Sequence, residues 1–196
     1  MKTSRLFLAL CISGISAGAF AQSLQEIQQR DVNQQQRIES GLQNGSLNTR
    51  EAGILERDQK KLQATEARDL RNGKLSGAER QQLDRMENRT SREINEAKTN
   101  GVKGDPLSTS SQRMQADVQR NINEDKRIDN GVKNGSLTNR EVSKLDRGQA
   151  RVDGKESQAA KSGYVNKREE NGIQSAESAQ SRRIHKLKTN DHTRKG

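Results

Sequence analysis

Four copies of one short motif carry side chains that could bind a cation. In each copy a Gly is followed two positions later by an apolar residue, three positions later by a polar residue and six positions later by a Glu. The copies begin at Gly45, Gly73, Gly135 and Gly163, and they end at Glu51, Glu79, Glu141 and Glu169. Because hard cations prefer carboxylate and amide oxygens, a Glu at a fixed distance from a turn suggests calcium binding.

The motif resembles the calcium-binding loop of EF-hand proteins when its Gly is placed at loop position 6 and its Glu at position 12. The first and third copies supply the most oxygen donors, namely Ser40, Asn44, Asn48 and Glu51, and Asn130, Asn134, Thr138 and Glu141. However, loop position 3 is apolar in every copy, and the final Glu is the only carboxylate at a ligand position. The motif therefore predicts a turn between two helices, and weak calcium binding is the alternative interpretation.

Two histidines, His185 and His192, are candidate ligands for zinc, copper or nickel. They are seven residues apart, so they would share a face of any helix that extended to His192. Two imidazoles do not complete a metal site, and the only cysteine, Cys11, lies in the N-terminal segment discussed below. We expect solvated histidines and no cofactor, with a transition-metal site as the alternative.

The C-terminal segment is rich in positive charge. It contains Arg182, Arg183, Lys186, Lys188, Arg194 and Lys195, against a single acid at Asp191. Such a segment attracts anionic polymers or membrane surfaces. Tyr164 is the only aromatic residue after Phe20, so stacking on nucleic-acid bases is not expected. The segment predicts an anionic partner without specific nucleic-acid recognition.

The composition argues against an enzyme, because catalysis requires a reactive group held in a pocket that excludes water. Leu, Ile and Val number only 27 after Ala21, roughly 15% of those residues, which is typical of a marginal core. Carboxylates such as Glu66 and Glu87 alternate with Arg and Lys, which predicts solvated helix faces. We therefore expect a non-enzymatic protein.

Residues 1–21 have the pattern of a Sec-type signal peptide. Lys2 and Arg5 precede an apolar run that ends in Ala19-Phe20-Ala21, a sequence typical of a signal-peptidase site. The run is too short to span a bilayer. Cleavage after Ala21 would leave a chain with no cysteine, no transmembrane span and a formal charge of +8 instead of +10. The pattern predicts a periplasmic or secreted protein.

Amphipathic helices must position these residues. Leu83, Met86, Thr90, Ile94 and Ala97 recur at helical spacing, and each Gly motif combines a helix end with the Ser, Thr or Asn and the Glu of a capping box. We expect helices at about 23–43, 48–71, 77–99, 113–133, 138–161 and 167–189. Two glycines, Gly148 and Gly154, weaken the fifth helix of this series.

The pattern recurs at an offset of 90 residues, which predicts an all-α fold of two tandem three-helix modules behind the signal peptide. The predicted divisions are a signal peptide at 1–21, a first module at 22–100, a linker at 101–112, a second module at 113–190 and a basic disordered tail at 191–196. The linker contains Pro106, the only proline in the chain, together with Gly101 and Gly104.

Each half contains Arg-Ile, two glycines, a Leu and a Glu in fixed order, from Arg37 to Glu51 and from Arg127 to Glu141. Together with Ser181-Arg182-Arg183-Ile184-His185, these motifs resemble a group of largely uncharacterised small secreted bacterial helical proteins with degenerate EF-hand-like repeats. The resemblance covers most of the chain. It implies a helical fold and an envelope location, and it implies no reaction.

These observations lead to one hypothesis and two alternatives. We expect a binding or scaffold protein of the bacterial envelope, which contacts partner helices through an apolar seam that includes Leu83, Ile94, Ile173 and Ile184. The alternatives are a weak calcium or transition-metal binder and a binder of anionic polymers or membrane surfaces.

Overall fold

The computed structural model describes residues 17–192, and side chains are described from Leu24 onward. The described chain is all-α, as predicted, and contains no strand. Its helices are α1 (Ala17–Gln43), α2 (Thr49–Asp69), α3 (Gly77–Thr99), α4 (Thr109–Lys133), α5 (Asn139–Ala160) and α6 (Lys167–Lys188), and the short 3₁₀ helix η1 (Leu70–Asn72) extends α2. None of these helices is long and apolar enough to cross a membrane. The predicted signal-peptide residues 1–16, and Arg194 and Lys195, lie outside the described residues.

Local sequence explains where α2, α3, α5 and α6 begin. At the start of α2, the Asn48 side chain accepts a hydrogen bond from the Glu51 amide at 2.9 Å, and the Glu51 carboxylate accepts one from the Asn48 amide at 3.1 Å. Equivalent capping boxes begin α3, α5 and α6. The Gly that opens each motif has a positive φ, from 72° at Gly45 to 88° at Gly73, a conformation that disfavours other residues. The predicted helix-turn-helix role of the motif is therefore confirmed.

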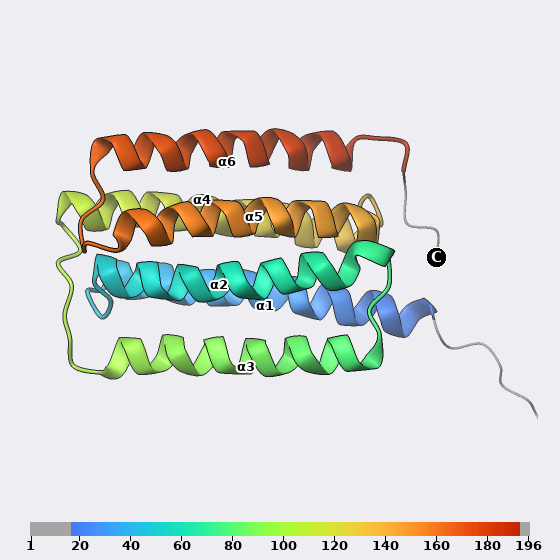
Figure 1. Ribbon diagram of the computed structural model, residues 1–196, viewed down its shortest axis with the longest axis horizontal. Coiled ribbons are helices and arrows are strands. Elements are labelled where there is room, and N and C mark those ends of the chain that lie inside the picture. The colour runs from blue at the N-terminus through green and yellow to red at the C-terminus, as the bar shows by residue number, and fades with distance from the viewer. Residues whose placement is uncertain (1–16, 193–196) are drawn as a thin grey trace, which may run out of the picture.

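The six helices form one bundle. α1, α2, α4 and α5 make up its centre, where α2 packs most extensively against α5 and α1 against α4. α3 covers α1 and α2 on one side, and α6 covers α4 and α5 on the other (Figure 1). The packing of α2 against α5 requires a glycine at position 53, because a Cβ on Gly53 would lie 2.4 Å from the Cβ of Ala160. The two halves of the chain are thus packed together along their length.

Two groups of apolar side chains occupy the two ends of the bundle. One contains Ile38, Leu42 and Leu47, and the other contains Leu24, Leu62 and Leu70. The apolar seam predicted as a partner surface is part of these groups, since Leu83, Ile94, Ile173 and Ile184 are all buried by the chain itself. The prediction that this seam is free to bind other proteins is therefore wrong.

Two helices begin earlier than predicted, and the first of them is α1, which starts at Ala17 instead of about 23. α4 begins at Thr109 instead of 113, so the predicted linker 101–112 loses its last residues to the helix. The reason is a cap, because the Ser108 hydroxyl accepts a hydrogen bond from the Ser111 amide at 3.2 Å. α5 is continuous despite Gly148, which admits the side chain of Gln180 from α6. The amide of Gln180 donates to the Leu145 carbonyl at 2.9 Å and so helps to fix this contact.

Candidate metal centres in the bundle core

The structure uses the glutamates of the EF-hand-like loops as helix caps. Glu51 accepts hydrogen bonds from the Asn48 amide at 3.1 Å and from the Asn100 side chain at 2.7 Å, so both of its oxygens have donors. Glu141 makes the same pair of contacts with Thr138 at 2.9 Å and Asn190 at 2.7 Å.

The remaining loop candidates also face their own turns or solvent. The side-chain oxygens of Asn44 and Asn134 accept hydrogen bonds from the Ser46 and Ser136 amides, at 2.9 and 3.0 Å. Ser40 and Asn130 are exposed, one turn before the helix end. These hydrogen bonds account for the conformation of the loops without a bound cation.

The two histidines are exposed on the last turn of α6 and just beyond it. Neither His185 nor His192 belongs to a group of three potential metal ligands within the described part of the chain. The groups that do meet this condition consist of carboxylates, and the sequence patterns did not point to them.

Many acidic side chains lie inside the bundle. Glu66 and Glu87 were predicted to lie on solvated helix faces, but both are fully buried, so that prediction is wrong. Glu56, Asp153 and Glu156 are also 0% exposed. A signal was present in the spacing, because Glu87 lies on the buried stripe formed by Leu83, Thr90 and Ile94, at steps of three and four residues.

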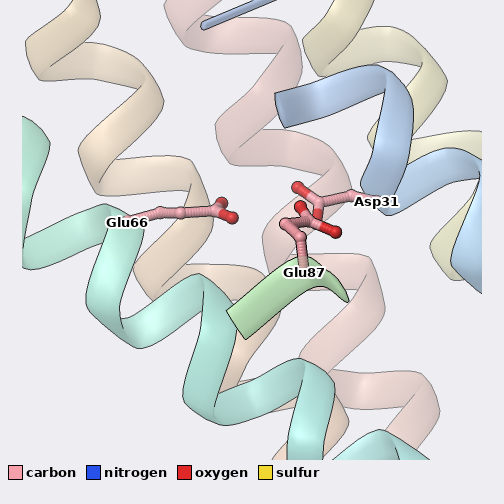
Figure 2. Close-up of side chains that lie close together, drawn as sticks. All are labelled: Asp31, Glu66 and Glu87. Carbon is pink, nitrogen blue, oxygen red and sulfur yellow. The ribbon is translucent and has the colours of Figure 1, made fainter. Parts of the chain in front are cut away.

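The Asp31 cluster consists of Asp31 from α1, Glu66 from α2 and Glu87 from α3. Each contributes a carboxylate oxygen, and these oxygens lie within 4.8 Å of one another. Figure 2 shows the three side chains converging from three helices. Asp146 of α5 adds a fourth negative charge that acts on both Asp31 and Glu66.

Glu66 lacks donors of the kind that normally accompany a buried carboxylate. Neither of its oxygens accepts a hydrogen bond from an amide, hydroxyl or cationic group of the described residues. Glu87 accepts a hydrogen bond from the side-chain amide of Gln34. The nearby Arg30 is held by Asp84 at 3.3 Å and by Asn88, and it leaves Asp31 and Glu66 without a neutralising cation.

The Asp153 cluster consists of Glu56 from α2 and of Asp153 and Glu156 from α5, with ligand oxygens again within 4.8 Å of one another. The Asn121 amide donates to both oxygens of Glu156, at 3.0 and 2.9 Å, and the Gln35 amide donates to Glu56 at 3.0 Å. Neither oxygen of Asp153 accepts a hydrogen bond from another residue of the described chain. Asp153 therefore resembles Glu66, since both are buried and neither accepts a hydrogen bond from an amide or cationic group of another described residue.

Burial and mutual repulsion disfavour the ionised form of these groups. Burial raises the pKa of Glu56 to about 8 and that of Glu87 to about 7. The pKa values of Asp31, Glu66, Asp153 and Glu156 also lie well above their usual range, first because of burial and then because of neighbouring acids. A bound cation would reverse the repulsive contribution to these shifts.

The two clusters occupy related places in the two halves of the chain. At the 90-residue offset, Glu66 corresponds to Glu156, Glu87 to Glu177, and Glu56 to Asp146. Two positions exchange an acid for an amide, because Asp31 corresponds to Asn121 and Gln63 to Asp153. An acid lost at one position is thus matched by an acid gained at another.

The donor chemistry of both clusters suits a hard divalent cation. Ca²⁺, Mg²⁺ and Mn²⁺ prefer carboxylate and amide oxygens at about 2.0–2.6 Å, so two oxygens on one ion are separated by no more than about 5 Å. The oxygens of each cluster meet this condition at 4.8 Å. Softer metals prefer imidazole or thiolate ligands, and neither cluster contains one.

Comparison of the chain with protein-family models, with curated proteins and with solved structures finds no match. The functional argument therefore depends on the geometry of the clusters.

Proposed function

We propose that this protein is an exported, non-enzymatic helical bundle that binds hard divalent cations in the Asp31 and Asp153 clusters. One observation carries the proposal. Glu66 is fully buried, no amide or cationic group of the described residues donates to its oxygens, and it points toward two further carboxylates, of which Asp31 is its hydrogen-bond partner (Figure 2). Isolated buried charges are costly unless they are paired or coordinate a metal.

The proposal keeps the envelope-binding role expected from the sequence and moves the binding site into the core. The signal-peptide pattern of residues 1–21, the predicted tandem three-helix modules and the resemblance to secreted bacterial helical proteins support the exported location. Calcium remains among the proposed cations, although its predicted ligands in the loops are replaced by core carboxylates.

Burial of the clusters supports a binding role over catalysis. Asp31 is 2% exposed, and Glu66 and Glu87 are 0% exposed, so an organic substrate cannot reach these oxygens while the bundle is closed. A dehydrated cation is small enough to be enclosed during folding or local opening. Binding would then be coupled to folding, because the unfolded chain offers no assembled site.

The proposal is tested by thermal unfolding of the mature chain, residues 22–196, after treatment with a chelator. Addition of Mn²⁺, Mg²⁺ or Ca²⁺ is expected to raise the Tm. A cation at 100 times its Kd stabilises the folded state by about 2.7 kcal/mol, which corresponds to roughly 5–10 °C for a chain of this size.

Two pairs of variants locate the binding. Glu66→Gln with Glu156→Gln changes the clusters and is expected to abolish the cation-dependent rise in Tm. Glu51→Gln with Glu141→Gln changes the loops by the same charge and is expected to preserve it. A rise that survives in the first pair and disappears in the second would refute the core sites and favour the EF-hand-like loops.

A further inference from the structure

A groove on the surface of the second half is lined almost entirely by cations. It has a volume of about 340 Å³ and lies between α5 and α6. Its lining residues, called here the cationic groove, are Lys144, Arg147, Arg151, Arg183, Lys186 and Leu187. The five cations on its walls are accompanied by no acidic lining residue.

The positive charges of the cationic groove are not neutralised within the described chain. None of the five cationic side chains forms an ion pair with a described carboxylate. The only polar side-chain contact among them is a long hydrogen bond from Arg183 to the Gln180 oxygen at 3.4 Å. These side chains therefore remain available to an anion from solution.

In the first half, an acidic side chain neutralises the cations at the equivalent positions. At the 90-residue offset, Arg147 and Arg151 correspond to Arg57 and Lys61, and Gly148 corresponds to Asp58. Asp58 forms ion pairs with Lys61 at 2.6 Å and with Arg57 at 3.7 Å.

The α6 side of the cationic groove is also more positive than the equivalent α3 surface of the first half. Glu93 and Glu96 of α3 occupy the positions that Arg183 and Lys186 occupy on α6. All three acids of the first half are thus absent from the second, and two of them are replaced by cations.

We infer that the cationic groove binds a chain of closely spaced phosphate groups. Five cations around about 340 Å³ require a ligand with several negative charges in a small volume, and linked phosphates provide that density. Three of the five are arginines, whose guanidinium groups match phosphate oxygens in a bidentate manner. A groove between two helices also suits a narrow chain better than a flat membrane surface.

The cationic groove contains only some of the residues that the sequence predicted to bind anions. Of the six residues predicted to bind anions, only Arg183 and Lys186 line it. Lys188 points elsewhere, because its ammonium group donates to the Arg127 carbonyl at 2.9 Å. Arg182 is exposed outside the lining, and Arg194 and Lys195 lie outside the described residues. The principal cations of the site instead include Lys144, Arg147 and Arg151 of α5.

The test measures binding of short-chain inorganic polyphosphate to residues 22–196 at several salt concentrations. A chelator is present throughout, so that cations in the core clusters cannot bridge protein and ligand. The variant Arg183→Glu with Lys186→Glu restores the acids of the first half, and we expect it to weaken binding by about tenfold or more and to reduce the salt dependence. Arg147→Gln with Arg151→Gln, which changes the opposite wall, is expected to have an effect in the same direction.

The matched control is Arg168→Glu with Arg182→Glu, which places the same charge change on exposed positions of α6 outside the groove. Its polyphosphate affinity is expected to stay within about threefold of the parent chain, since it changes only the long-range field. Equal losses in the groove and control variants would overturn the inference, and so would tighter binding to phosphatidylglycerol vesicles that the groove variants leave unchanged. Circular dichroism of each variant confirms that the helices are retained.

Discussion

The two halves of the bundle place different side chains at equivalent core positions on α1 and α4. α1 carries Ile27, Gln34 and Gln35, whereas α4 carries Asp117, Glu124 and Asp125 at the 90-residue offset. All six side chains are buried, with at most 5% of their surface exposed. The same backbone arrangement therefore accommodates either neutral or acidic side chains at these positions. The second half contains more buried acidic side chains than the first.

A second difference concerns one arginine. Arg30 is held by Asp84 and Asn88, but the equivalent Arg120 has Gln174 and Ser178 at those positions and instead pairs with Glu177 at 2.6 Å. Glu87, the counterpart of Glu177, has no ion pair with Arg30, whose charge still lowers its pKa, and its hydrogen-bond partners are the Gln34 amide and the Asp31 carboxyl. Because Asp84 holds Arg30 away from direct contact with Glu87, the Asp31 cluster is the stronger candidate for a cation.

The largest expected effect concerns pH. Burial raises the pKa of Asp117 to about 8, that of Glu124 to about 8 and that of Asp125 to about 7. Because these folded-state values exceed the unfolded ones, the folded chain binds more protons between about pH 4 and pH 8, and its stability falls as the pH rises through that range. We expect the chelator-treated protein to lose several °C of Tm between pH 5 and pH 8.5.

The variant Asp117→Asn, Glu124→Gln and Asp125→Asn brings α4 closer to the composition of α1. It is expected to raise the Tm at pH 8.5 and to flatten the pH dependence, by about 1 kcal/mol or more for each pKa unit removed. Hydrogen exchange adds a regional measurement, in which α4 should lose protection before α1 as the pH rises. Equal loss of protection in the two helices would contradict the difference between the halves.

The next test transfers the charges of the cationic groove to the first half and looks for a second polyphosphate-binding site. Asp58→Asn, Glu93→Arg and Glu96→Lys, combined with Ile54→Lys at the position that corresponds to Lys144, give the α2–α3 surface the five charges of the cationic groove. If local charge decides polyphosphate binding, the stoichiometry per chain should double, with a second Kd within about tenfold of the first. Titration calorimetry measures both values, and an unchanged stoichiometry would mean that binding depends on the shape of the cationic groove as well as on its charge.

A smaller effect is expected from exchange of the arginine partners. Asp84→Asn frees Arg30 to pair with Glu87, which should weaken cation binding in the Asp31 cluster by about three- to tenfold. Arg120→Gln removes the ion pair of Glu177, whose negative charge acts on Glu156, and should strengthen binding in the Asp153 cluster by a similar factor. Calorimetry measures the Mn²⁺ affinity of both variants. The affinity is expected to fall in Asp84→Asn and to rise in Arg120→Gln.

The helix caps should show the smallest effect. Ser76→Ala and Thr138→Ala each remove a side-chain acceptor from a capping box, at a cost of about 1 kcal/mol or roughly 2–4 °C of Tm. Cation binding should be unchanged in both, since the caps are separate from the core clusters. A lower Ca²⁺ affinity in Thr138→Ala alone would restore the third loop as a metal site.

The sequence predicted the features that depend on neighbouring residues. The positive φ at Gly135 and the capping box of Thr138 and Glu141 follow from local chemistry, and both are present. The buried stripe of Leu83 and Ile94 also follows from spacing within one helix. Helix limits defined by caps and turn glycines agree to within a few residues, whereas the start of α1, which has no such motif, differs by more.

The acidic clusters could not be predicted by the same means, because they depend on which helices meet. Asp31, Glu66 and Glu87 come from three helices, and alternation with Arg and Lys resembles a solvated face when each helix is considered alone. The positions of Glu87 on its apolar stripe and of Glu66 between Leu62 and Leu70 were the local signs of burial. The cationic groove likewise requires the packing of α5 against α6, which brings Arg147 near Arg183.

The pairing of α1 with α4 and of α2 with α5 has a consequence for assembly. Related helices contact each other across the centre of the bundle, as the subunits of a two-fold symmetric dimer do. The segment between α3 and α4 holds the halves at a high effective concentration, and it is anchored where the Gly104 amide donates to the Gly45 carbonyl at 2.9 Å. An isolated first half would leave one side of α1 and α2 uncovered, and a second copy of it would offer related helices to cover that side.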